Sequence, residues 1–151
     1  MSTLKNSKLS HSLGYTLKQT QHRLRMAMDE ALRPLGLTTP QYVVLGQLKL
    51  KPGVSNAALA RASFITAQTM HSIVTHLEKN NLVTRKRDPK HGRILCTELT
   101  KQGETLVQKA YKIIVSVEAA MVATLSPDRV ALLEGLLLEC FNNLSPVGVN
   151  E

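Results

Sequence analysis

Apolar residues recur at intervals of three and four along most of the chain, with polar residues between them. This spacing is typical of amphipathic helices that bury one face. Proline, glycine and hydroxyl-bearing residues divide the pattern into segments, because they favour helix ends and N-caps. The divisions predict six helices: one over 9–33, a second with Thr39 as N-cap, a short third after Ser55, a fourth after Thr66, a long fifth after Thr100 and a last one after Ser126.

A different pattern interrupts the helices after Asn80 and Asn81. The segments 82–85 and 93–99 resemble two short strands, and the connection 88–92 holds Asp, Pro and Gly, which favour turns. The expected order is α-α-α-α-β-β-α-α. Two short helices followed by a hairpin predict a winged helix-turn-helix domain. We therefore predict a mainly α fold with a small β-hairpin wing and additional terminal helices.

The length of 151 residues fits a single domain with its own hydrophobic core. Within it we expect a DNA-binding lobe over 37–103 and a helical dimerisation region over 9–35 and 104–144. A dimer is expected because three terminal helices carry more apolar surface than one chain covers, and large exposed apolar patches mark interfaces. The alternative is that these helices pack only on one another within one chain.

Positive charge is concentrated in the first two thirds of the sequence. The chain has 19 Lys and Arg against 11 Asp and Glu, a net charge of +8, and residues 1–103 hold 16 of the cations and 5 of the acids. The densest cluster lies over 85–93, with five cations and one Asp. Such a cluster is typical of proteins that bind a polyanion, although a charge run can also be a solvated loop.

The fourth helix pairs an apolar face with a face of short polar and amide side chains. Met70, Ile73, Val74 and Leu77 give the apolar face. The opposite face suits hydrogen bonding to base edges in a major groove about 12 Å wide, and the hairpin cations suit phosphates or a minor groove. The alternative is the ordinary solvent face of a helical core. The candidate DNA-binding residues are Thr66, Gln68, Thr69, His71, Ser72, Thr75, Arg85, Arg87, Lys90 and Arg93.

Other classes of function find little support. The sequence has no glycine-rich phosphate loop, nucleophile elbow or His spacing for a metal, so we expect no enzyme, cofactor or metal site. No segment approaches the roughly 18 apolar residues of a membrane span, and the first residues lack the apolar core of a secretory signal. We expect a cytoplasmic protein. Cys96 and Cys140 form no disulfide framework or zinc motif. We expect both to be small buried apolar residues rather than redox sensors.

Several motifs between residues 36 and 103 resemble those of the MarR family of transcriptional regulators. They are Gly36-Leu37-Thr38, Gln41 to Leu45, Ala58-Leu59-Ala60, Thr66 to Met70, Leu77-Glu78, Leu82-Val83 with Arg85, His91 to Leu95 and Leu99 to Gly103. The resemblance implies a homodimer that binds a pseudo-palindromic operator, with its first, fifth and sixth helices at the dimer interface. It also implies relief by a small phenolic or anionic ligand. We expect a repressor; the alternative is an architectural DNA-binding protein without a dedicated operator.

The hairpin departs from the commonest wing of that family, in which an Asp precedes paired Arg. The corresponding segment here is His91-Gly92-Arg93. By resemblance, Arg93 matches the arginine that family members place in or near the minor groove. The only nearby acid, Asp88, lies five residues upstream, so the partner of Arg93 is left open.

A small-molecule site is expected beside the first helix. The helix places four polar residues on one face at i, i+4, i+7 and i+11: His11, Tyr15, Lys18 and His22. Tyr42 and Tyr111, from the second and fifth helices, are expected nearby. A cation, imidazoles and phenols over an apolar floor suit a small aromatic acid, and the resemblance implies an effector pocket in this neighbourhood. The alternative is a solvated polar face.

Overall fold

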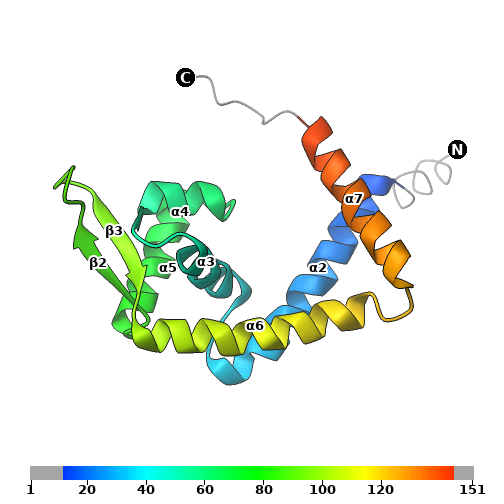
Figure 1. Ribbon diagram of the computed structural model, residues 1–151, viewed down its shortest axis with the longest axis horizontal. Coiled ribbons are helices and arrows are strands. Elements are labelled where there is room, and N and C mark those ends of the chain that lie inside the picture. The colour runs from blue at the N-terminus through cyan, green and yellow to red at the C-terminus, as the bar shows by residue number, and fades with distance from the viewer. Residues whose placement is uncertain (1–11, 145–151) are drawn as a thin grey trace, which may run out of the picture. The chain divides into compact units, whose positions relative to one another are not determined.

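The computed structural model describes residues 12–144 and divides the chain into two compact units, one up to Val117 and one from Glu118 (Figure 1). The elements of the first unit are α2 (Leu13–Leu32), η1 (Arg33–Leu35), α3 (Thr39–Leu50), β1 (Val54–Ser55), α4 (Asn56–Ala62), α5 (Ala67–Lys79), β2 (Val83–Arg87), β3 (Leu95–Leu99) and most of α6 (Lys101–Met121). The second unit holds the end of α6 and α7 (Pro127–Asn143). This order confirms the predicted mainly α fold with a β-hairpin between the fourth and fifth helices.

The sheet has three strands rather than the two that the sequence predicted. All pairs are antiparallel, in the order β1-β3-β2. The additional strand, β1, pairs Val54 with Thr97 and Ser55 with Cys96. Two residues are too few to show an alternating pattern, so β1 had no detectable signal in the sequence. The hairpin strands are also shifted, because β2 extends to Arg87 and β3 begins only at Leu95.

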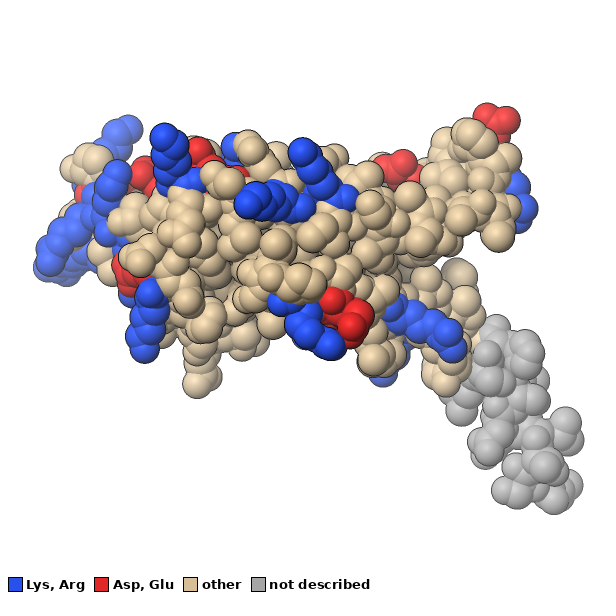
Figure 2. All heavy atoms as spheres, turned by 90° about the horizontal axis from the view of Figure 1, so that it is seen from below, with Lys and Arg blue, Asp and Glu red and all other residues tan. Residues whose placement is uncertain are grey.

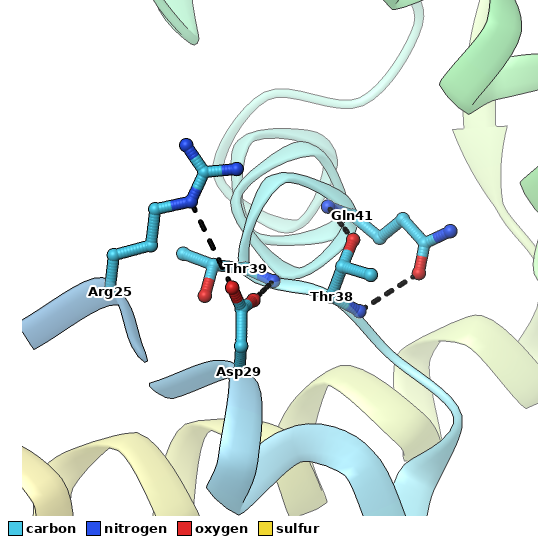
Figure 3. Close-up of polar contacts among 5 residues, drawn as sticks. All are labelled: Arg25, Asp29, Thr38, Thr39 and Gln41. Atoms are coloured by element: carbon cyan, nitrogen blue, oxygen red, sulfur yellow. Dashed lines mark hydrogen bonds and ion pairs between the residues drawn. The ribbon is translucent and has the colours of Figure 1, made fainter. Parts of the chain in front are cut away.

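The beginning of α3 differs from the predicted one by a residue. Thr38, not Thr39, is the N-cap: its Oγ1 accepts from the backbone N–H of Gln41, and its own N–H donates to Gln41 Oε1 at 3.0 Å (Figure 3). Thr39 is the first helical residue, and its backbone N–H donates to Asp29 Oδ1 at 2.7 Å. Arg25 Nε lies 3.8 Å from the other oxygen of this carboxylate. A reciprocal capping box and an acid from α2 thus fix the start of α3.

The other predicted helix starts are confirmed. Ser55, Thr66 and Ser126 each accept a hydrogen bond from the backbone N–H three residues later, at the starts of α4, α5 and α7. Thr100 Oγ1 accepts from Gly103 N–H at 3.0 Å and donates to the carbonyl of Asn81 at 2.6 Å. Of the predicted first helix, α2 begins at Leu13 after the N-cap Ser12, and residues 9–11 lie outside the described part of the chain.

The hydrophobic core lies in the first unit and holds α5 against its neighbours. It includes the predicted apolar face of α5, with Met70, Val74 and Leu77 fully buried and Ile73 partly buried. These residues belong to one cluster with buried residues of α3, α4, α6 and β2, such as Leu45, Leu59, Val107 and Val83. The polar face of α5 is therefore left toward solvent. None of the helices between residues 12 and 144 is long and apolar enough to cross a membrane.

The start of α6 is packed closely against the loop between α5 and β2. Gly103 is buried, and a Cβ atom at this position would lie 2.0 Å from the carbonyl oxygen of Leu82. The same carbonyl oxygen accepts a hydrogen bond from the backbone N–H of Thr100 at 3.0 Å. Only a glycine allows this approach, so Gly103 fixes the position of α6 relative to α5 and the hairpin.

Candidate nucleic-acid interface and effector groove

The polar face of α5 is exposed as the sequence predicted. Gln68, Thr69, His71 and Ser72 are all exposed, and within residues 12–144 the side chains of Gln68 and His71 make no hydrogen bond. Ser72 is anchored to its own helix, because its Oγ donates to the carbonyl of Gln68 at 3.4 Å. The helix thus presents an amide, an imidazole and hydroxyls on a rigid scaffold, which is what hydrogen bonding to base edges requires.

Two of the predicted residues, the N-cap Thr66 and Thr75 of α5, have a more constrained position. Thr66 is exposed, but its Oγ1 accepts the capping bond from Thr69 N–H and donates to Thr69 Oγ1 at 3.0 Å. Thr75 is only partly exposed, and its Oγ1 is enclosed without a hydrogen-bond partner in the described chain. Gln68, Thr69, His71 and Ser72 are therefore better placed for base contacts than Thr66 or Thr75.

The basic cluster of the hairpin separates into paired and unpaired cations. Lys86 Nζ lies 3.0 Å from Glu98 Oε2 across the strand pair, and Arg85 pairs with Glu78. Arg87, Lys90 and Arg93 are exposed and have no ion pair within residues 12–144. Figure 2 shows Lys and Arg side chains spread over this face of the molecule, with several of them at the left, where Figure 1 has the hairpin. Three unpaired cations are thus available for phosphates.

Asp88 organises the loop between β2 and β3. Its Oδ1 accepts hydrogen bonds from the backbone N–H groups of Lys90, at 2.6 Å, and His91, at 3.1 Å, and these bonds hold the pKa of Asp88 below its usual value. The backbone N–H of Asp88 also donates to the carbonyl of Ile94 at 2.8 Å. The acid therefore shapes the loop and is not paired with Arg93. Arg93 therefore has no acidic partner within residues 12–144.

Arg85, one of the predicted DNA-binding residues, makes an ion pair with Glu78 of α5. Its Nε donates to Glu78 Oε2 at 3.0 Å and its Nη2 contacts the same oxygen. The hydrogen bonds from Arg85 lower the pKa of Glu78, and the guanidinium is mostly covered, with 22% of its side chain exposed. This pair joins β2 of the hairpin to the last turns of α5. The pair therefore helps to position the hairpin on α5, and a direct DNA contact by Arg85 stays a prediction.

An open, largely apolar groove of about 770 Å³ lies between α3 and α6. Two of the predicted ligand residues, Tyr42 and Tyr111, line it together. Sequence reasoning missed the other polar residues of this groove, which are Gln47, Lys49, Gln108 and Lys112. The signal was present, because Tyr42, Gly46 and Lys49 recur at helical spacing, as do Gln108, Tyr111 and Lys112.

The remaining predicted ligand residues are not part of this groove. Tyr15, Lys18 and His22 are exposed on α2 and do not line it. His11 lies outside the described residues. The structure therefore brings together the tyrosines of α3 and α6 with two lysines, while the polar face of the first helix lies outside this groove.

The two cysteines lie in different environments. Cys96 is partly buried, with its Sγ 3.7 Å from Asp88 Oδ2. Burial and then the negative charge of Asp88 raise the pKa of this thiol, which keeps it protonated. Cys140 is exposed on α7 rather than buried as expected. Among residues 12–144, no group of His, Cys, Asp and Glu could hold a metal ion.

Comparison with known proteins places this architecture in one family. The sequence profile of the MarR family matches residues 35–94. The HTH-type transcriptional repressor Rv2887 of Mycobacterium tuberculosis is 37% identical over 114 residues, which cover 76% of this chain and 82% of that protein. The transcriptional regulator HosA of Escherichia coli O157:H7 is 29% identical over 93% of this chain and 98% of its own length.

Solved structures agree with the sequence relatives. The repressor CouR bound to a 23-mer DNA duplex superposes with a TM-score of 0.82 at 28% identity, over 88% of this chain and 94% of that one. Rv2887 of Mycobacterium tuberculosis in complex with salicylic acid gives a TM-score of 0.72 at 33% identity, over 85% of this chain and 96% of that one. The winged helix-turn-helix, the matching profile and the identity over most of a repressor's length together show that the chain belongs to the MarR family of transcriptional regulators.

Proposed function

We propose that the protein is a homodimeric, sequence-specific DNA-binding repressor whose hold on its operator is relieved by a small aromatic acid. One observation carries this proposal: the exposed polar face of α5 lies next to a hairpin with three unpaired cations. A face of neutral polar groups supplies base recognition, and the cations supply affinity for phosphates. The protein acts by binding its operator DNA in the cytoplasm and catalyses no reaction.

In the proposed DNA complex, α5 contacts the bases and the hairpin contacts the phosphates. Gln68 is suited to a bidentate contact with adenine, and Thr69 and Ser72 are suited to single hydrogen bonds with base edges. Arg87 and Lys90 neutralise phosphates, and Arg93 reaches the backbone or the minor groove beside it. The lobe over residues 37–103 supplies all of these groups. The structure of the repressor Rv2887, which is similar in sequence to this chain, has also been solved in complex with DNA.

The terminal helices supply the dimer interface of this proposal. α7 has no buried residue in the described chain, and five of its leucines are exposed: Leu132, Leu133, Leu136, Leu137 and Leu138. α2 adds Leu13, Leu17 and Met26, which are also exposed. Because apolar patches of this extent mark interfaces, a second copy is their expected partner. A twofold dimer presents two reading helices to two half-sites of a pseudo-palindrome.

The groove between α3 and α6 is the proposed effector site. Its apolar floor suits an aromatic ring, and Lys49 and Lys112 suit a carboxylate, with the phenols of Tyr42 and Tyr111 at its wall. Rv2887 has been solved with salicylic acid and with p-aminosalicylic acid, both aromatic acids of this size. An effector here lies against α3, which precedes the reading helix in the same unit.

Selection from a random pool of DNA duplexes tests the proposal. The purified protein is expected to enrich one pseudo-palindromic motif, to keep its preference for that motif in competition with random DNA as salt is raised, and to release it when salicylate is added. Equal binding of enriched and random duplexes at every salt concentration would instead support the architectural alternative. Footprinting on the region upstream of the protein's own gene would then show whether the selected motif occurs there.

A further inference from the structure

The turn between α4 and α5 has an unusual residue at its centre. Ile65 N–H donates to the carbonyl of Ala60 at 3.0 Å, and Phe64 N–H donates to the carbonyl of Arg61 at 3.3 Å. This pair of bonds is the Schellman motif that ends many helices, in which the residue corresponding to Phe64 has a left-handed backbone. Phe64 has a φ of +53°, as the motif requires. Glycine is strongly favoured at this position, because a Cβ atom makes the left-handed conformation costly.

The other positions with positive φ between residues 12 and 144 follow the usual preference. They are Gly36, Gly53 and Asn81. Asn81 is the closest match to Phe64, because it ends α5 with the same pair of hydrogen bonds, Leu82 N–H to Leu77 and Asn81 N–H to Glu78. Asparagine tolerates this conformation, whereas phenylalanine is a true outlier there. The backbone of the helix-turn-helix therefore does not call for an aromatic residue at position 64.

Packing does not explain Phe64 either. Its side chain is 86% exposed, while the next residue, Ile65, is directed into the core. An exposed phenylalanine in a strained conformation lowers the stability of the fold twice, through the backbone and through the solvated ring. Such an outlier is a reason to look for a function.

The surroundings of Phe64 indicate its partner. It stands two residues before Thr66, the N-cap of the reading helix, and Gln68 and Thr69 follow in the exposed first turn. Arg61, whose carbonyl Phe64 binds, is exposed in the last turn of α4 and has no ion pair within the described residues. An exposed cation and an exposed aromatic residue in one turn, directly before the exposed polar face of α5, fit a phosphate and a thymine better than they fit an apolar protein surface.

We propose that Phe64 is a specificity-determining residue that packs its ring against the C5-methyl group of a thymine in the major groove, where the reading helix enters. Phenylalanine is among the residues that contact this methyl group in protein–DNA complexes. The left-handed turn is what directs the ring outward while Ile65 points inward. This inference rests on the proposed function, because it requires an operator.

The experiment replaces each thymine of the selected duplex in turn by deoxyuridine, which removes only the methyl group, and measures affinity for the full chain. In the wild-type protein, one thymine in each half-site is expected to show a loss of about fourfold, the value for one buried methyl-sized group. Phe64→Gly is expected to weaken binding to the thymine duplex and to lose the difference between thymine and deoxyuridine at that position. The same variant is expected to unfold at a higher temperature, because glycine accepts the left-handed turn.

Two further variants make the outcome interpretable. Asn81→Gly removes the other non-glycine side chain with positive φ, and it is expected to keep the wild-type affinity and the wild-type sensitivity to deoxyuridine. Phe64→Asn, which tolerates the same backbone, is expected to behave as Phe64→Gly does. Wild-type affinity in both Phe64 variants would overturn the inference and point to a protein partner for the ring. Weaker binding with unchanged deoxyuridine sensitivity would overturn the thymine contact. Failure of the wild-type protein to enrich any duplex would overturn the proposed function itself, and this inference with it.

Discussion

Arg85 of β2 donates a hydrogen bond from its Nε to Glu78 Oε2 of α5 at 3.0 Å, so a polar contact joins the hairpin to α5 in addition to the apolar packing of Val83. The pair lies at the end of the helix, away from the exposed residues of its first turns. Any operator that contacts both α5 and the hairpin depends on the angle between them. The contact therefore connects the proposed base-reading helix to the proposed phosphate-binding hairpin.

We expect Glu78→Gln and Arg85→Ala each to lower the free energy of unfolding by about 1 kcal/mol or less, because the pair is partly exposed and screened. The hydrogen bonds from Arg85 lower the pKa of Glu78 below 4.5, its ordinary value. A lowered carboxyl pKa contributes stability that is present above the ordinary value and is lost as pH falls through the folded-state value. Urea unfolding of both single variants and the double variant at pH 7 and pH 3 checks this. A coupling between the two residues that is as large at pH 3 as at pH 7 would contradict it.

We expect Gly103→Ala to be strongly destabilising, by about 3 kcal/mol, because the new methyl group collides with the backbone of Leu82 rather than with a flexible side chain. Gly14→Ala is the matched control, since a Cβ atom on that helical glycine meets nothing within 4 Å. Thermal or urea unfolding of the two variants gives the comparison. Equal stabilities for Gly103→Ala and the wild-type protein would mean that α6 is not held against Leu82 as described.

We expect Lys112→Ala to weaken salicylate binding about tenfold, the usual effect of losing a hydrogen bond to a charged group. Lys109→Ala serves as the control, because Lys109 is on the same helix but does not line the groove between α3 and α6. Titration calorimetry measures both, and operator affinity without salicylate is expected to stay unchanged in both. If both variants lose the same salicylate affinity, then either salicylate binds outside this groove or the loss reflects only the change in net charge.

We expect Leu136→Glu to convert the dimer into a monomer, because it places a charge on the exposed apolar surface of α7, where Leu136 is 50% exposed. Glu139→Gln on the same helix is expected to remain a dimer. Sedimentation equilibrium at micromolar concentration distinguishes one chain mass from two. A wild-type protein that sediments as a monomer would remove the two-half-site account, whatever the variants do.

The elements that periodicity defines were predictable from the sequence. The apolar face of α5 repeats over about two turns, from Met70 to Leu77, and the capping residues Ser55, Thr66 and Ser126 are local in sequence. β1 was not predictable, because two residues become a strand only through pairing with β3. The predicted start of α3 was wrong by one residue because Thr38 and Thr39 have the same side chain. Their roles are decided by their partners: Gln41 forms the capping box with Thr38, and Asp29 accepts from the backbone N–H of Thr39.

The candidate sites were likewise predictable only where the signal is local in sequence. The exposed residues of α5 follow from the helix period alone, so the sequence placed Gln68, His71 and Ser72 correctly on the outer face. The roles of the hairpin cations depend on partners that are distant in sequence. Arg85 is engaged by Glu78 and Lys86 by Glu98, which no local pattern indicates. The effector groove likewise required knowing that α3 packs beside α6.

The most direct test of the account is a pair of titrations, one with the selected operator and one with a scrambled duplex, at one stated salt concentration. Gln68→Ala and Ser72→Ala are expected to weaken operator binding while leaving scrambled-duplex binding nearly unchanged, since a lost base contact costs about 1–3 kcal/mol of discrimination. Arg87→Ala and Lys90→Ala are expected to weaken both together, because phosphates carry no sequence information. If the α5 variants weaken both duplexes equally, α5 is not the reader, and the central claim fails.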